Sequence, residues 1–138
     1  MILKVNLYNK LLPLFFVFVF LLSSCEEASK SGQENMVPLP DPLAAGWQGA
    51  SVCELIEENE AVRVLKCTFP PGVGHERHYH PKHFGYTLKG GKFRITDTTG
   101  TREVNIPTGF DFFNEVIAWH EVLNIGIDTA VFLIMEPK

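Results

Sequence analysis

Short alternating segments constrain the fold of residues 47–138 more than any other feature of the sequence. Apolar and polar residues alternate there with a period of two, and Gly or Asp turns interrupt the short apolar runs. No window is long enough for a convincing amphipathic helix. We therefore expect one all-β domain of roughly seven or eight strands, closed into a barrel or a sandwich.

A first hairpin is expected to turn around Asn59. In the corresponding register, Glu57 lies opposite Arg63 and Glu54 lies opposite Lys66, so opposite charges meet across the two strands. The same register brings two cysteines, Cys53 and Cys67, face to face. A cross-strand disulfide fits an oxidising compartment, and two buried free thiols are the alternative.

Glycines mark the later turns. Gly90-Gly91 is expected to form a second hairpin, because two glycines supply the positive φ angles of a tight turn. The run from Asp97 to Gly100 is expected to turn the chain again. The insertion 110–119 is either a lid over the barrel mouth or an ordinary strand with its loop, and further strands are expected near residues 120–125 and 130–135.

The N-terminal segment has the form of a secretory signal. Its apolar run, residues 11–22, carries no charge and is shorter than the roughly 20 residues of a membrane span, and Lys4 and Lys10 precede it. The following Leu22-Ser23-Ser24-Cys25 resembles the lipobox of bacterial lipoproteins. That resemblance implies lipidation at Cys25, with a plain signal peptide as the alternative.

These features divide the chain into three parts: a signal peptide over residues 1–24, the lipidated Cys25 with a flexible linker over residues 25–46, and a folded domain over residues 47–138. Loss of the two lysines of the signal moves the formal net charge from −4 to −6. A charge of this sign disfavours a nucleic-acid partner. The expected location is the cell envelope, and the resemblance to enteric lipoproteins favours the outer membrane, with membrane contact through the lipid anchor only.

Histidine placement points to chemistry. The five histidines stand at positions 75, 78, 80, 83 and 120, so four of them fall within nine residues. His78 and His80 are separated by one residue, and on a β-strand such a pair projects to one face, where it can share a metal ion. A histidine-rich surface turn is the alternative reading of the cluster.

Two motifs resemble those of the cupin family. The first, written G-x5-H-x-H-x3-4-E-x6-G, resembles the set Gly72, His78, His80, His83 and Gly90. The second, written G-x5-P-x-G-x2-H-x3-N, resembles the set Gly100, Pro107, Gly109, His120 and Asn124. The resemblance covers about residues 60–136. It implies a single β-barrel of the double-stranded β-helix or jelly-roll type.

The resemblance also implies a set of metal ligands: His78, His80, His120 and, where the family has a glutamate, His83. Four neutral imidazoles leave the full charge of the ion to attract an anionic ligand. Iron, manganese, nickel, copper and zinc all suit such ligands. His75 lies outside the motif and is assigned to a loop.

The function expected from this resemblance is that of a metal-dependent enzyme, a dioxygenase or an isomerase, acting on a small and anionic molecule. The alternative is a cupin module that binds a small ligand or a metal without turnover. Lys92 and Arg94 are candidate partners of a substrate carboxylate, with simple exposure to solvent as the alternative. Single-domain cupins are often dimers, so a homodimer is also expected.

Overall fold

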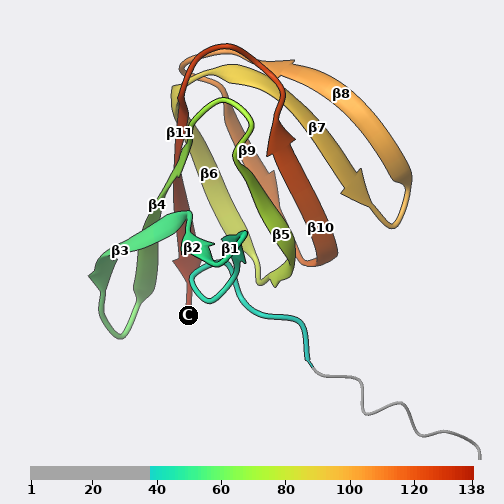
Figure 1. Cartoon of the computed structure of the whole chain (residues 1–138). Coiled ribbons are helices and arrows are strands. Elements are labelled where there is room, and N and C mark those ends of the chain that lie inside the picture. Colours follow the sequence, from blue (N-terminus) through green and yellow to red (C-terminus); the bar gives the residue numbers. More distant parts are fainter. Residues whose placement is uncertain (1–37) are drawn as a thin grey trace, which may run out of the picture. The chain divides into compact units, whose positions relative to one another are not determined.

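The computed structural model describes residues 38–138 (Figure 1). The predicted signal peptide, the lipidation site Cys25 and the linker up to residue 37 lie outside the described residues. Over the described part, the chain forms eleven β-strands. No helix of residues 38–138 is long and apolar enough to cross a membrane.

The strands form two main sheets and one small ribbon, which confirms the predicted all-β class. The five-stranded sheet has the order β3-β4-β11-β6-β9, the four-stranded sheet has the order β5-β10-β7-β8, and β1 pairs with β2. The strands are β1 (Gly46–Trp47), β2 (Ala50–Ser51), β3 (Cys53–Glu58), β4 (Val62–Phe69), β5 (Gly74–His80), β6 (His83–Lys89), β7 (Gly91–Asp97), β8 (Gly100–Ile106), β9 (Asp111–Asn114), β10 (Ile117–Asn124) and β11 (Ala130–Pro137). The insertion 110–119 is thus an ordinary strand, β9, leading into β10.

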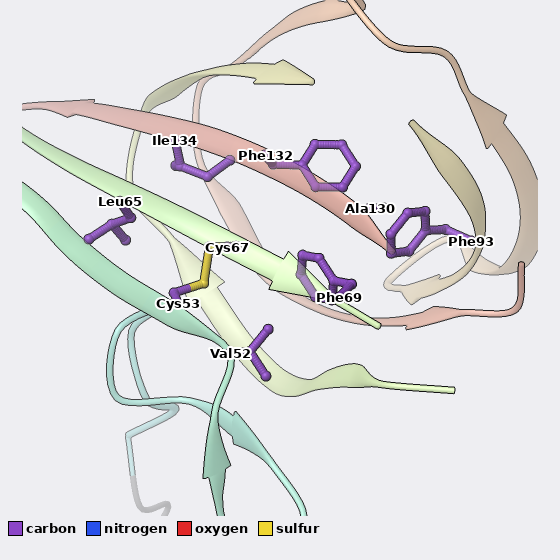
Figure 2. Packing of buried hydrophobic residues seen from close by; sticks show 9 residues of the cluster. All are labelled: Val52, Cys53, Leu65, Cys67, Phe69, Phe93, Ala130, Phe132 and Ile134. Atoms are coloured by element: carbon purple, nitrogen blue, oxygen red, sulfur yellow. A yellow bond between two sulfur atoms is a disulfide. The ribbon is translucent and has the colours of Figure 1, made fainter. Parts of the chain in front are cut away.

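Alternate residues of both main sheets meet in one hydrophobic core. Phe69 of β4, Phe93 of β7 and Phe132 of β11 contact one another edge to face, with ring centroids 5.4 to 5.9 Å apart. Figure 2 shows these rings together with the other buried side chains of the cluster. Because β7 belongs to one sheet and β4 and β11 to the other, these three rings join the two sheets.

The first hairpin forms with one correction to the predicted register. Glu54 pairs with Lys66 as expected, at an ion-pair distance of 2.5 Å. A β-bulge in β3 then shifts the register, so that Glu58 and not Glu57 lies opposite Arg63. The predicted pairing of Glu57 with Arg63 is wrong because a strict period of two cannot register an extra residue in one strand.

Cys53 and Cys67 are register partners, and the structure joins them in a disulfide (Figure 2). Both cysteines are buried, with 4% and 3% of their surface exposed. The bridge therefore ties β3 to β4 inside the core and not at its surface.

The second predicted hairpin, at Gly90-Gly91, is wrong. The strands on either side belong to different sheets, since β6 pairs with β11 and β9 whereas β7 pairs with β10 and β8. Gly90 is needed for a close crossing and not for a positive φ angle: a Cβ atom there would lie 2.3 Å from the carbonyl oxygen of Ile106 and 2.7 Å from the amide nitrogen of Thr108. The turn from Asp97 to Gly100 is confirmed, and Gly100 has a φ of 117°.

The predicted linker ends earlier than residue 46. Pro42 and Ala45 are buried, and the amide of Tyr79 donates to the carbonyl oxygen of Pro40. Asp41 forms an ion pair of 2.5 Å with Arg63 of β4. Residues 38–46 therefore pack as part of the domain, and the boundary expected at residue 47 is too late. The Pro-rich sequence of this segment has no strand periodicity that would indicate these contacts.

Reduction of the disulfide should destabilise the domain by up to about 3 kcal/mol, the loop-closure value for a bridge that spans about 15 residues. The expected result is a lower guanidinium midpoint of the wild type in the presence of a reductant. The double variant Cys53→Ala/Cys67→Ala is the matched control, because its midpoint should not respond to reductant. A wild-type midpoint that does not change on full reduction would contradict the assigned role of the bridge.

Candidate metal centre

Strands β5 and β10 carry the histidines of the site. The two strands are antiparallel, and His120 of β10 is the register partner of His78 of β5. His78 and His80 are two residues apart and both face the interior, with 0% and 5% of their surface exposed, whereas the intervening Tyr79 is exposed. The predicted placement of His78 and His80 on one strand face is thus confirmed.

A β-bulge brings a further histidine to the same face. The register runs from His78 opposite His120 to His75 opposite Val122, so β5 has one more residue than β10 over this stretch. The extra residue turns His75 inward, where it is buried and its ring centroid lies 3.8 Å from that of His78. The assignment of His75 to a loop is wrong, because β5 begins at Gly74, before the first histidine of the motif from which the assignment was made. Alternation from His78 would not have placed His75 inward either, because the bulge breaks it.

Three imidazole nitrogens converge. The Nε2 atom of His78 lies 3.0 Å from Nε2 of His80 and 3.0 Å from Nε2 of His120. Imidazole nitrogens that share an ion at about 2.0–2.1 Å lie roughly 2.8 to 3.4 Å apart, depending on the angle at the metal. The spacing therefore fits a shared ion, and these three histidines can hold one.

The backbone fixes which ring nitrogens face the cluster. Nδ1 of His78 lies 2.6 Å from the carbonyl oxygen of Glu76, and Nδ1 of His83 lies 2.8 Å from that of Pro81. A carbonyl oxygen only accepts, so Nδ1 of each ring carries the hydrogen and Nε2 keeps a lone pair when the ring is neutral. Such acceptors behind the ring are typical of histidines that ligate metals.

His83 lies beside the cluster but outside the three converging atoms. It is 1% exposed, and its ring centroid is 4.5 Å from that of His80. Its Nε2 accepts a hydrogen bond of 3.2 Å from the side-chain amide of Asn114, which β9 places opposite it. To act as a fourth ligand, His83 would have to give up the hydrogen bond from Asn114 and turn its Nε2 to the metal. The assignment of His83 as a metal ligand therefore stays a prediction.

A buried carboxylate lies behind His80. Glu136 of β11 is 3% exposed and accepts from Arg63, whose Nε and Nη2 atoms lie 2.6 and 2.5 Å from Oε2. The other oxygen, Oε1, lies 3.6 Å from Nδ1 of His80, and neither atom has a hydrogen-bond partner. Sequence reasoning missed this carboxylate; its one signal is an acidic residue at an inward position of an apolar strand.

Burial keeps the rings neutral. It lowers the pKa of His78 to about 2 and the pKa values of His80 and His120 to about 3, and neighbouring histidines add to each shift. Burial also lowers the pKa of His75. Neutral imidazole is the form that binds metal, so the site does not have to lose protons near neutral pH.

The cluster opens onto a cavity of about 750 Å³ between the two sheets. Aromatic side chains form much of its wall, including Phe69, Phe93, Phe110, Phe112, Trp119 and Phe132. Arg102 of β8 is the one lysine or arginine among the described residues that line it, and Asp97 is the one carboxylate. These two form an ion pair of 2.6 Å, and hydrogen bonds from Thr99 and Arg102 lower the pKa of Asp97 to about 2.

The basic residues expected to reach a substrate point elsewhere. Lys92 and Arg94 of β7 are half exposed, both pair with Glu103 of β8, and neither lines the cavity. Their proposed role is therefore wrong, because their even-numbered positions lie on the outer face of β7. Arg102 was not identified from the sequence as a candidate anion partner, because no motif marks the inner face of β8.

No family model matches the chain, and no curated protein matches it. Among solved structures, a cupin domain from Bordetella pertussis is similar with a TM-score of 0.60 and 23% identity, over 63% of this chain and 92% of that one. An RmlC-like cupin with a double-stranded β-helix fold from Methanocaldococcus jannaschii gives 0.51 and 17%, over 62% and 78%. The polyketide cyclase RemF from Streptomyces resistomycificus gives 0.52 and 17%, over 62% and 63%. The domain has the cupin fold, which confirms the expected β-barrel architecture.

The metal-free protein should lose stability as pH falls below about 6.5. The unfolded chain binds protons at its histidines there, whereas His78, His80 and His120 stay neutral in the folded state down to about pH 3. The free energy of unfolding should fall from about pH 7 to about pH 5, where few carboxylates titrate. Thermal melts in a chelating buffer check this, and the variant His78→Gln should show a shallower fall. A melting temperature independent of pH over this window would contradict buried neutral rings.

Proposed function

We propose that this protein binds one divalent transition metal at His78, His80 and His120 and acts on a small anionic molecule in the adjoining cavity. The observation that carries the proposal is the convergence of three Nε2 atoms from histidines that line the cavity. Buried polar atoms that face one another in this way are unusual unless they share a proton or an ion.

The bound ion would be iron, manganese, nickel, copper or zinc, since neutral imidazoles suit all of them. An ion there would act as a Lewis acid toward a substrate oxygen. The chain itself supplies orientation: backbone carbonyls hold the rings of His78 and His83, and aromatic side chains line the space beside them.

The cavity favours a substrate with an apolar body and one anionic group. Aromatic and aliphatic side chains dominate its lining, so an apolar body would be desolvated there. Arg102 has donors beyond the one that it gives to Asp97, and a planar guanidinium suits a carboxylate. Three neutral histidines around a divalent ion would leave its charge uncompensated, which adds a second attraction for an anion.

The enzyme that we propose is a dioxygenase or an isomerase. A binding module without turnover is the second candidate, because Asp97, the one carboxylate among the described lining residues, is already bound by Arg102 and Thr99 and is a poor general base. Iron together with oxygen uptake on a small diketone, phenol or thiol supports the oxygenase. Tightly bound zinc without turnover supports the binding module.

We further propose that the mature protein is lipidated at Cys25, lies in the bacterial cell envelope at the outer membrane, and forms a homodimer. The lipobox-like run before Cys25 supports the anchor. The Cys53–Cys67 disulfide supports an oxidising compartment such as the envelope. The dimer rests on the resemblance to single-domain cupins.

Metal retention should depend on the paired histidines. The double variant His78→Ala/His80→Ala should lose stoichiometric metal after dialysis, as measured by elemental analysis, while its circular dichroism stays that of a β-protein. Tyr79→Ala, which truncates the exposed residue between them, is the matched control and should retain metal. A folded double variant that retains one ion per chain would exclude the proposed site.

Anion binding should depend on Arg102. In the metal-loaded protein, Arg102→Gln should weaken the affinity for small carboxylates, such as benzoate or oxalate, by about 10- to 100-fold, the loss expected for one charge-assisted hydrogen bond. Arg94→Gln removes an arginine that pairs with Glu103 outside the cavity and should leave these affinities unchanged. Titration calorimetry measures both, and equal behaviour of the two variants would exclude Arg102 as the anion partner.

A further inference from the structure

We propose that Glu136 is a positioning residue for the metal centre: in the metal-loaded protein its free carboxylate oxygen accepts a hydrogen bond from Nδ1 of His80 and so holds Nε2 of that ring toward the metal. This inference rests on the proposed function, since it assigns a role relative to the proposed metal. None of the three converging ligands is a carboxylate. Glu136 would therefore act on the centre through the ring of His80, without contacting the metal itself.

The first argument is that both atoms of the contact lack any other partner. Oε1 of Glu136 and Nδ1 of His80 are buried, and neither makes a hydrogen bond to any described residue. An unsatisfied buried polar atom costs about 1 to 3 kcal/mol, and more if it is charged. Two such atoms 3.6 Å apart can satisfy each other with a small movement.

The second argument comes from the neighbouring rings. Nδ1 of His78 and Nδ1 of His83 each have a carbonyl oxygen behind them, at 2.6 and 2.8 Å. For His80, the position of that acceptor is taken by the carboxylate of Glu136. A carboxylate is the stronger acceptor, and it makes the imidazole a more basic ligand at Nε2.

The third argument is that Glu136 is itself held. Arg63 binds Oε2 through two nitrogens, so only Oε1 remains free to turn toward His80. Arg63 is the register partner of Glu136 and also pairs with Asp41, at 2.5 Å. This chain of contacts runs from Asp41 through Arg63 and Glu136 to His80.

The distance of 3.6 Å is too long for a hydrogen bond, which for charged partners is about 2.7 to 2.9 Å. The Nδ1 hydrogen becomes a stronger donor when the other ring nitrogen is bound to a cation. The bond is therefore expected to close in the metal-loaded protein, and the tests are made in that state.

The variant Glu136→Gln keeps the shape of the side chain and removes its charge. It should weaken the affinity for Co²⁺ or Zn²⁺, measured by competition with a chelator, by about 10- to 100-fold, the usual effect of removing an outer-shell partner. Glu103→Gln is the matched control, because it also removes a carboxylate that pairs with an arginine, but at an exposed site outside the cavity. An affinity of Glu136→Gln within about threefold of that of Glu103→Gln would overturn the inference.

A double-mutant cycle separates positioning from general stability. In the background His80→Ala, the residual metal affinity should respond to Glu136→Gln by less than about threefold, because the ring through which Glu136 acts is gone. An undiminished effect in that background would overturn the role assigned through His80. Wild type without measurable affinity for either ion would instead overturn the proposed function.

A measurement on the wild type keeps the inference falsifiable if Glu136→Gln does not fold. In the ¹⁵N-labelled protein loaded with Zn²⁺, the Nδ1 hydrogen of His80 should give a low-field proton signal that exchanges slowly with water. Absence of a protected signal at that ring nitrogen, with the signal of His78 present, would overturn the inference.

Discussion

Burial of imidazole rings between two sheets is the constraint on which the rest of the site depends. Desolvation disfavours the charged form of a buried ring, so His78, His80 and His120 stay neutral, with one N–H group and one lone pair each. The Nδ1 hydrogen of His78 points at the carbonyl oxygen of Glu76, which leaves the lone pair of its Nε2 directed at the Nε2 atoms of His80 and His120, each 3.0 Å away. Three ring nitrogens that meet in this way can hold a cation.

Irregular pairing of β5 with β10 makes this arrangement possible. Register shifts flank His120, so this residue meets His78 directly while the strand stays continuous on either side. The extra residue of β5 stacks His75 on His78. At the start of β5, Gly74 leaves room for the ring of Trp47, because a Cβ atom there would lie 2.5 Å from that ring. The small β1–β2 ribbon therefore packs against the start of β5, next to His75.

Alternation and motif spacing predicted much of this from sequence. They gave the all-β class, the facing of Cys53 and Cys67, and the placement of His78 and His80 on one face, because each of these depends on local period or on one regular register. Predictions failed where one strand has an extra residue, as at His75, and where glycines mark a sheet crossing, as at Gly90. The ion pairs that link Asp41, Arg63 and Glu136 could not be predicted from the sequence, because the three residues come from distant segments and no local pattern relates them.

X-ray absorption on the purified, metal-loaded protein tests the central claim most directly, because it reports the atoms bound to the ion. The account predicts about three imidazole nitrogens at about 2.0–2.2 Å, with the outer-ring scattering typical of histidine, and further light scatterers in the remaining positions. A shell of oxygen alone, or a sulfur ligand at about 2.3 Å, would contradict a metal centre built from His78, His80 and His120.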